Sequence, residues 1–152
     1  MKFYAVSGLA FLIGIGLAFA GTKIMTPAKQ PEPPFNFDTA ERPDRLAFLS
    51  SEAAQIGASI ETSLGGLMEM DQPLLNPETR RITYRIHVDG RDSASFDPRA
   101  LKMQIYPKLC PGYVESPLGK QSIAVIQKFV AKNGTGTLMK IVLSNRVCSR
   151  FI

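Results

Sequence analysis

Few side chains in this sequence could do covalent chemistry. The single histidine, His87, stands two residues before Asp89, and Ser144 lies far along the chain. A serine, a histidine and an aspartate can form a nucleophilic triad, but a triad is defined by geometry rather than by sequence position. Ser144 does not lie in a nucleophile elbow. We therefore expect His87 to be a surface residue and the chain to have no catalytic site.

The two cysteines, Cys110 and Cys148, are the other reactive side chains. Together with one histidine they are too few ligands for a metal site, and they do not form a C-x-x-C redox pair. Gly134 and Gly136 belong to a turn rather than to a phosphate loop, so we expect neither a metal nor a cofactor. A disulfide closing the 37 intervening residues is the expected state, worth roughly 4 kcal/mol. Free buried thiols are the alternative.

Basic side chains are concentrated in the C-terminal half. Residues 21–79 carry four basic and nine acidic side chains, a net charge of −5, whereas residues 80–152 carry thirteen and four, a net charge of +9. We expect a solvated basic surface that could dock onto an acidic protein or lipid. Nucleic acid is not expected as a partner, because no base-stacking motif is present. The expected contact residues are Arg81, Arg85, His87, Lys128 and Lys140.

The N-terminus is strongly apolar. Residues 3–22 carry no charge and are long enough to cross a bilayer as a helix. Ala18-Phe19-Ala20 also has the pattern of a signal-peptide cleavage site. We predict a transmembrane anchor or signal peptide over residues 1–23. An uncleaved anchor is the favoured reading, and cleavage after Ala20 is the alternative.

The rest of the chain divides into a spacer and one domain. Five prolines within residues 24–43 favour extended backbone, which predicts a Pro-rich linker there and a folded domain over 44–152. The cysteine pair suits an oxidising compartment. We therefore expect a protein of the bacterial inner membrane with its C-terminal domain in the periplasm, or a periplasmic or secreted protein after cleavage.

Apolar periodicity gives the order of the elements in the domain. From Leu46 to Leu67 apolar residues recur every three or four positions, which predicts a helix that stops at Gly65-Gly66. Its apolar stripe favours packing on a sheet, with a coiled-coil seam as the alternative. Residues 71–78 have loop composition. The strict alternation over 82–88 predicts a strand with one wet face.

A second helix is expected to begin with Asp97 as its N-cap and Pro98 in its first turn, and Pro107 should kink or end it. Residues 123–131 and 138–147 are rich in β-branched and large apolar side chains, and they are predicted to form the two strands of a hairpin. The predicted fold class is α+β: an N-terminal transmembrane helix, then a small antiparallel sheet with helices packed on one face, in the order α-β-α-β-β.

From about Asn76 to Cys148 this layout resembles a loose class of small membrane-anchored or secreted bacterial envelope proteins of uncharacterised function. The resemblance is carried by the strand 79–88, a helix ending near Cys110, the turn 116–119 and a hairpin ending at Cys148. It implies an extracytoplasmic compartment and a disulfide, and it transfers no functional residues.

Taken together, these features favour a non-catalytic, membrane-anchored envelope protein. It would be an accessory or protein-binding component of a secretion, conjugation or envelope assembly. The alternative is a cleaved, soluble periplasmic or secreted protein that acts as an inhibitor, chaperone or ligand-binding protein.

Overall fold

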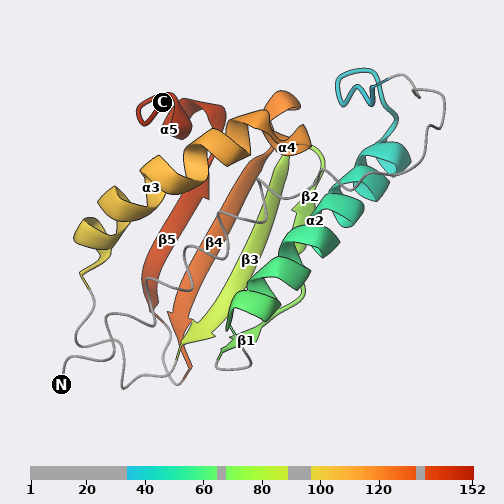
Figure 1. The fold of residues 1–152 in the computed structure, drawn as a ribbon. Coiled ribbons are helices and arrows are strands. Elements are labelled where there is room, and N and C mark those ends of the chain that lie inside the picture. Colours follow the sequence, from blue (N-terminus) through green and yellow to red (C-terminus); the bar gives the residue numbers. More distant parts are fainter. Residues whose placement is uncertain (1–33, 65–67, 89–96, 133–135) are drawn as a thin grey trace.

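In the computed structural model, five strands form one mixed sheet and the helices pack on one of its faces (Figure 1). The structure describes residues 34–64, 68–88, 97–132 and 136–152. The predicted anchor and the first half of the predicted linker, residues 24–33, lie outside the described residues. Within the described ranges, no helix is both long and apolar enough to cross a membrane.

The elements are α2 (Arg42–Leu64), β1 (Glu69–Met70), β2 (Leu74–Asn76), β3 (Arg81–Val88), α3 (Pro98–Glu115), α4 (Pro117–Lys120), β4 (Ala124–Ala131), β5 (Thr137–Leu143) and α5 (Asn145–Cys148). The α+β class is therefore confirmed.

The prediction of an antiparallel sheet is wrong, because β3 and β4 pair in parallel. The cause is α3, which carries the chain from the end of β3 back to the other end of the sheet before β4 begins. The remaining pairs are antiparallel: β1 and β2 lie along β3, and β5 lies along β4. The parallel pair therefore forms the middle of the sheet.

Two short strands were also missed. Part of the predicted loop 71–78 forms β2, and β1 lies just before it. Met70 and Leu75 from these strands pack against the core, and Pro73 lies between them. Strands of two and three residues are too short to give an alternating pattern, so only their pairing with β3 defines them.

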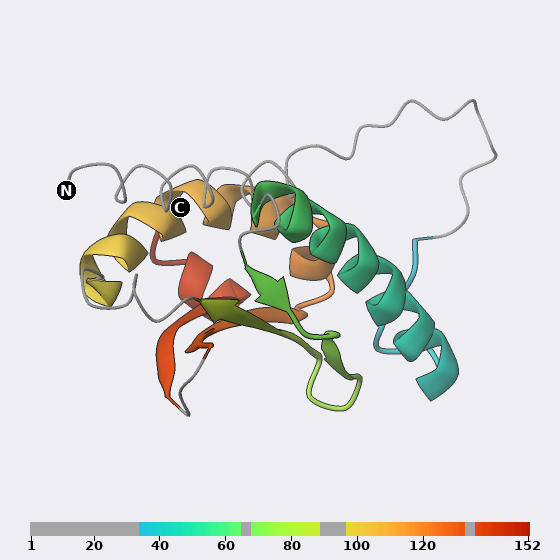
Figure 2. The ribbon, with the colours of Figure 1, turned by 90° about the horizontal axis from the view of Figure 1, so that it is seen from below.

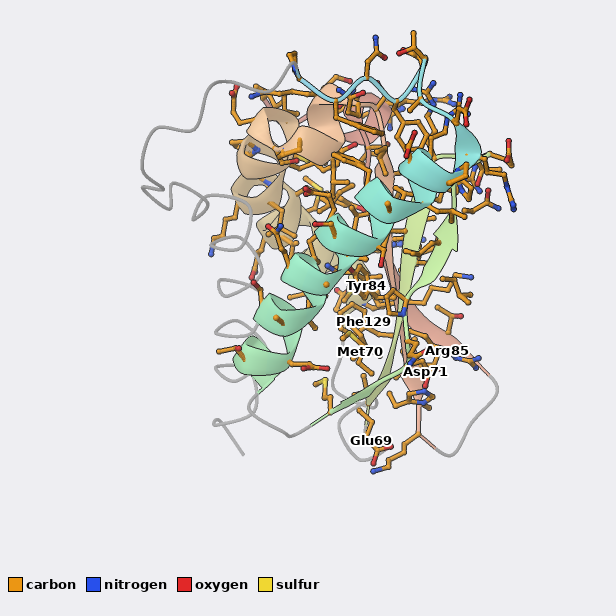
Figure 3. All side chains as sticks on the ribbon, turned by 90° about the vertical axis from the view of Figure 1, so that its right-hand side faces the viewer. Glu69, Met70, Asp71, Tyr84, Arg85 and Phe129 are labelled. Carbon is orange, nitrogen blue, oxygen red and sulfur yellow. A yellow bond between two sulfur atoms is a disulfide. The ribbon has the colours of Figure 1, made fainter. Side chains whose placement is uncertain are left out.

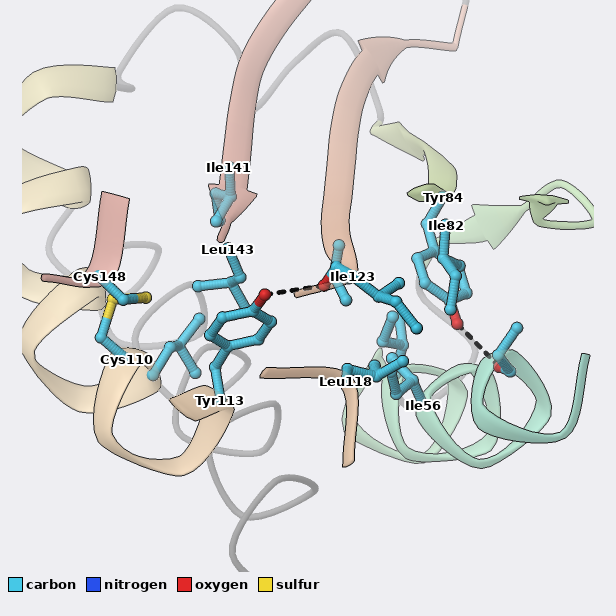
Figure 4. Close-up of a cluster of buried hydrophobic side chains, with 14 of the residues drawn as sticks. Ile56, Ile82, Tyr84, Cys110, Tyr113, Leu118, Ile123, Ile141, Leu143 and Cys148 are labelled. Atoms are coloured by element: carbon cyan, nitrogen blue, oxygen red, sulfur yellow. Dashed lines mark hydrogen bonds between the residues drawn. A yellow bond between two sulfur atoms is a disulfide. The ribbon is translucent and has the colours of Figure 1, made fainter. Parts of the chain in front are cut away.

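The helix α2 packs on its own sheet rather than in a coiled coil. It ends at Leu64, directly before the predicted glycine stop. The Tyr84 hydroxyl on β3 donates a 2.8 Å hydrogen bond to the Ala53 carbonyl on this helix (Figure 4). Its buried side chains are Leu49, Ala53, Ile56 and Ile60.

The last part of the predicted linker is packed against the domain. Phe37 is fully buried, and its N–H donates to Oε1 of Gln121 at 2.8 Å. Nε2 of the same glutamine donates to the carbonyl of Phe35, also at 2.8 Å. The guanidinium groups of Arg45 and Arg80 lie 5.4 and 5.1 Å from the Phe37 ring centroid. Ordered structure therefore begins before the predicted boundary at residue 44, because an aromatic residue of the linker has a buried site.

The second helix starts as predicted but does not stop at Pro107. Asp97 accepts hydrogen bonds from the N–H groups of Arg99 and Ala100, at 2.9 and 3.3 Å. The helix then continues through Pro107 and Pro111 to residue 115. Both prolines are exposed, so the carbonyl groups that lose a helical donor lie on the side open to water.

The predicted disulfide is present and joins α3 to α5, although α3 continues past Cys110 to Glu115 rather than ending near the cysteine. Cys110 on α3 is bonded to Cys148 on α5, with a Cα–Cα distance of 5.0 Å (Figure 4). Beside it, the Tyr113 hydroxyl donates to the Ile123 carbonyl at 2.8 Å. The second predicted hairpin strand ends early, at Leu143, because Ser144 caps α5. The disulfide thus fixes α3 over the β5 side of the sheet.

Candidate partner-binding face

The two faces of the sheet have different surroundings. The helices lie on one side only, which we call the helix face, and no described helix covers the other side, which we call the open face (Figure 2). Figure 3 shows Tyr84 and Phe129 on the helix side and Arg85 on the opposite side. The apolar residues of the helix face are Ile82, Tyr84, Ile86, Val125, Phe129, Met139, Ile141 and Leu143.

Strand register places all the expected contact residues on the open face. On β3, residues 81, 85 and 87 alternate with buried residues of the helix face. Lys128 is the register partner of Arg85, and Lys140 is the register partner of Lys128. Side chains at paired positions point to the same side of a sheet. Five residues that are far apart in the sequence therefore share one surface.

Three of these residues form what we call the cation row: Arg85, Lys128 and Lys140. They occupy directly opposite positions on three adjacent strands, where Cβ atoms lie about 5 Å apart. Among the described residues, none of the three forms an ion pair. Like charges placed opposite one another destabilise a sheet. The row is therefore a local electrostatic cost for the folded domain.

His87 differs from the row because it already has an acidic partner. Its Nε2 lies 2.9 Å from Oδ1 of Asp71, at the β1 margin of the face. At the same margin, Lys132 Nζ lies 3.0 Å from Oε1 of Glu69. Sequence reasoning missed both acids as members of this face, because only strand register brings them beside residues so far along the chain. The acids near this margin are thus already engaged.

The spaces between the cations do not form an exposed apolar patch. Ile126 and Val130 point to the open face but are only 8% and 5% exposed. Leu74, at 72% exposed, lies opposite Thr83 at the edge of the sheet. The open face therefore offers a ligand mainly positive charge.

The residues that could have formed a nucleophilic triad are not brought together. His87 is the register partner of Val130, which in turn pairs with Thr137 at the start of β5. Ser144 follows the last residue of β5. Seven residues of strand, about 23 Å, separate these ends. Ser144 Oγ instead accepts the N–H of Val147 at 3.3 Å, and Asp89 lies outside the described residues. In the described ranges, no group of three or more metal-ligating side chains is found.

The side chains with shifted pKa values belong to the core side of the domain. Burial raises the pKa of Tyr113 to about 12. Burial, with a further contribution from the Glu52 charge, raises the pKa of Tyr84 well above its usual value. Both hydroxyl groups donate to backbone carbonyls, which is a structural role. These shifts therefore do not identify a reaction centre.

Comparison of the chain with models of known protein families gives no match, and comparisons with curated proteins and with solved structures give none either. What the open face does is therefore argued from its own charge and geometry.

Proposed function

We propose that this chain is a non-catalytic binding protein of the bacterial envelope. In this proposal the apolar N-terminal segment holds it at the membrane, the linker sets its distance from the bilayer, and the open face binds an acidic protein. Such a part would serve as an accessory component of a secretion, conjugation or envelope assembly.

The observation that carries the proposal is the cation row. Three positive side chains face one another across β3, β4 and β5, and none of them forms an ion pair in the described part of the chain. The acid beside the row, Asp71, lies next to Arg85 but pairs with His87. The arrangement works against the stability of the isolated sheet, and an acidic partner would turn this repulsion into attraction. The basic excess of residues 80–152 supports the same reading.

Binding to a protein partner suits this face better than insertion into a membrane. Insertion needs a group of exposed apolar side chains. Among the described residues the large exposed ones are scattered over β2, α3 and the C-terminus, at Leu74, Met103 and Ile152. A flat, charged sheet face suits the rigid surface of an acidic protein, with charge contributing to the rate and specificity of association.

The test is charge reversal with a matched control. Arg85→Glu with Lys128→Glu reverses two members of the cation row. Arg99→Glu with Lys108→Glu makes the same change at exposed sites on α3, on the helix side. A photo-crosslinking residue at position 140, introduced into the full-length protein in its own cells, would identify the partner.

We expect the open-face pair to abolish co-purification of that crosslinked partner and the α3 pair to leave it intact. Equal behaviour of the two variants would refute the proposal. Sedimentation with anionic vesicles provides the second readout. Vesicle binding that depends on the same two residues, without a crosslinked protein, would replace the protein partner by a lipid surface.

The membrane attachment has its own test. The intact mass of the protein from the membrane fraction is expected to include residues 1–20. Loss of these residues would favour the cleaved, soluble alternative and would leave the proposal for the open face unchanged.

A further inference from the structure

The outer edge of β5 has backbone groups that point away from the sheet. The N–H of Val142 is directed outward, because it donates to the Tyr106 hydroxyl of α3 at 3.2 Å. In an antiparallel strand, alternate residues direct their N–H and C=O groups to the same side. Lys140 therefore also presents its backbone groups to this edge, while Met139 and Ile141 face β4. Beyond Met139 the register shifts by one residue, which marks a β-bulge at the start of β5.

Tyr106 closes only one end of this edge. Its ring stacks on Phe151, with 5.0 Å between the centroids, and its hydroxyl occupies the Val142 position. No described residue forms a side-chain hydrogen bond with the backbone of Lys140. The edge at Lys140 is therefore the part that the described residues leave open to another strand.

The opposite edge of the sheet is different. There the outer strand is divided into β1 and β2, with Asp71, Gln72 and Pro73 between them. Interruptions, charges and proline are features that prevent strand addition at a sheet edge. The seven-residue strand β5 is the longer of the two edges, and its one register shift lies near its start, beside Val130.

Charge indicates what kind of strand would fit. The cation row crosses β3 and β4 and ends at Lys140 on the edge strand. A strand added beside β5 would place every second side chain on the open face, with one of them about 5 Å from Lys140. An acidic side chain at that position would complete the row with an opposite charge.

We propose that the edge of β5 binds an extended acidic segment of the partner by strand addition, with its acidic side chains lying on the open face beside the cation row. This inference rests on the proposed function and specifies how the partner binds. Backbone hydrogen bonds to Lys140 would fix the register, and alternating carboxylates would give the specificity.

A labelled synthetic peptide of alternating glutamate and threonine, titrated into the full-length protein in detergent, tests the inference by fluorescence anisotropy. Two N-methylated versions of the peptide are compared. One is methylated at the residues that would face β5, and the other at the alternate residues. A peptide of the same composition with its glutamates in adjacent pairs is the control for net charge.

We expect one methylated set to weaken binding about tenfold or more and the other to have little effect, since only one set removes hydrogen bonds to the edge. The control with paired glutamates should also bind more weakly than the alternating peptide. Equal affinities of the two methylated sets, or no binding of the parent peptide, would overturn strand addition. If the methylated sets bind equally but Arg85→Glu with Lys128→Glu still abolishes binding, the open face binds acidic ligands without adding a strand, and only this inference fails.

Discussion

The two faces of the sheet use neighbouring residues for opposite purposes. On the helix face, Tyr84 and Tyr113 are buried and each hydroxyl has a carbonyl partner, so burial there is matched by hydrogen bonding. On the open face, three cations lie opposite one another and none of them forms an ion pair among the described residues. The comparison indicates that the helix face provides stability, whereas the open face retains charges that the fold does not need.

The largest expected effect on stability comes from removing the disulfide between α3 and α5. Replacing both Cys110 and Cys148 by serine removes the disulfide and should lower the free energy of unfolding by roughly 4 kcal/mol. Urea denaturation followed by circular dichroism measures the change. Reduction of the native protein should reproduce it, and a shift below about 1 kcal/mol would show that the crosslink is not a main source of stability.

Adjacent residues on β3 allow the two faces to be compared directly. Ile86→Ala empties a fully buried site on the helix face and should cost about 2 to 5 kcal/mol. Arg85→Ala, one residue away on the open face, should change stability by no more than about 0.5 kcal/mol. Similar losses for the two variants in urea denaturation would contradict the assignment of the faces.

Alkaline pH should destabilise the protein, because Tyr113 on the helix side of the sheet must ionise while buried. The pKa of Tyr113 is raised from 10.0 to about 12, so its contribution is complete below pH 10 and is lost as the pH rises through 12. A shift of this size corresponds to roughly 2 to 3 kcal/mol. Absorbance of the phenolate and circular dichroism should therefore change together above pH 10. Tyr113→Phe should reduce this alkaline sensitivity, and ionisation of all tyrosines near pH 10 with the fold intact would contradict it.

The helix face contains one polar side chain that lacks partners. Gln127 is fully buried between Tyr84 and Ile141, and neither atom of its amide has a hydrogen-bond partner in the described structure. Gln127→Leu should therefore raise stability by about 1 to 3 kcal/mol. The same substitution at Gln121, which makes two hydrogen bonds to the linker, should lower stability and is the matched control. A loss of stability in both variants would mean that Gln127 has a structural role.

The smallest effect is expected on the open face itself. Lys128→Thr removes the central charge of the cation row and should raise stability by about 0.2 to 1 kcal/mol at low salt. The gain should shrink as salt screens the remaining charges. Thermal unfolding at two ionic strengths measures it. A salt-independent loss would show that the lysine stem contributes more by packing than its charge costs.

Local sequence signals predicted much of the fold. The alternation of 82–88, the antiparallel pairing of β4 with β5 and the Asp97 cap each depend on residues close together in sequence. The parallel pairing of β3 with β4 and the edge strands β1 and β2 could not be predicted, because they depend on long-range register. The same limit applies to the candidate site. Alternation identified the outward residues, but only register aligned Lys128 with Lys140 and placed Asp71 beside His87.

The attachment of the linker has a mechanical consequence. Arg80 directly precedes β3 and Gln121 lies three residues before β4, and they hold Phe35, Phe37 and Asp38 at that end of the sheet. In the proposed membrane-anchored arrangement, tension on the N-terminal segment would therefore reach the domain where its two central parallel strands begin, rather than at an outer strand.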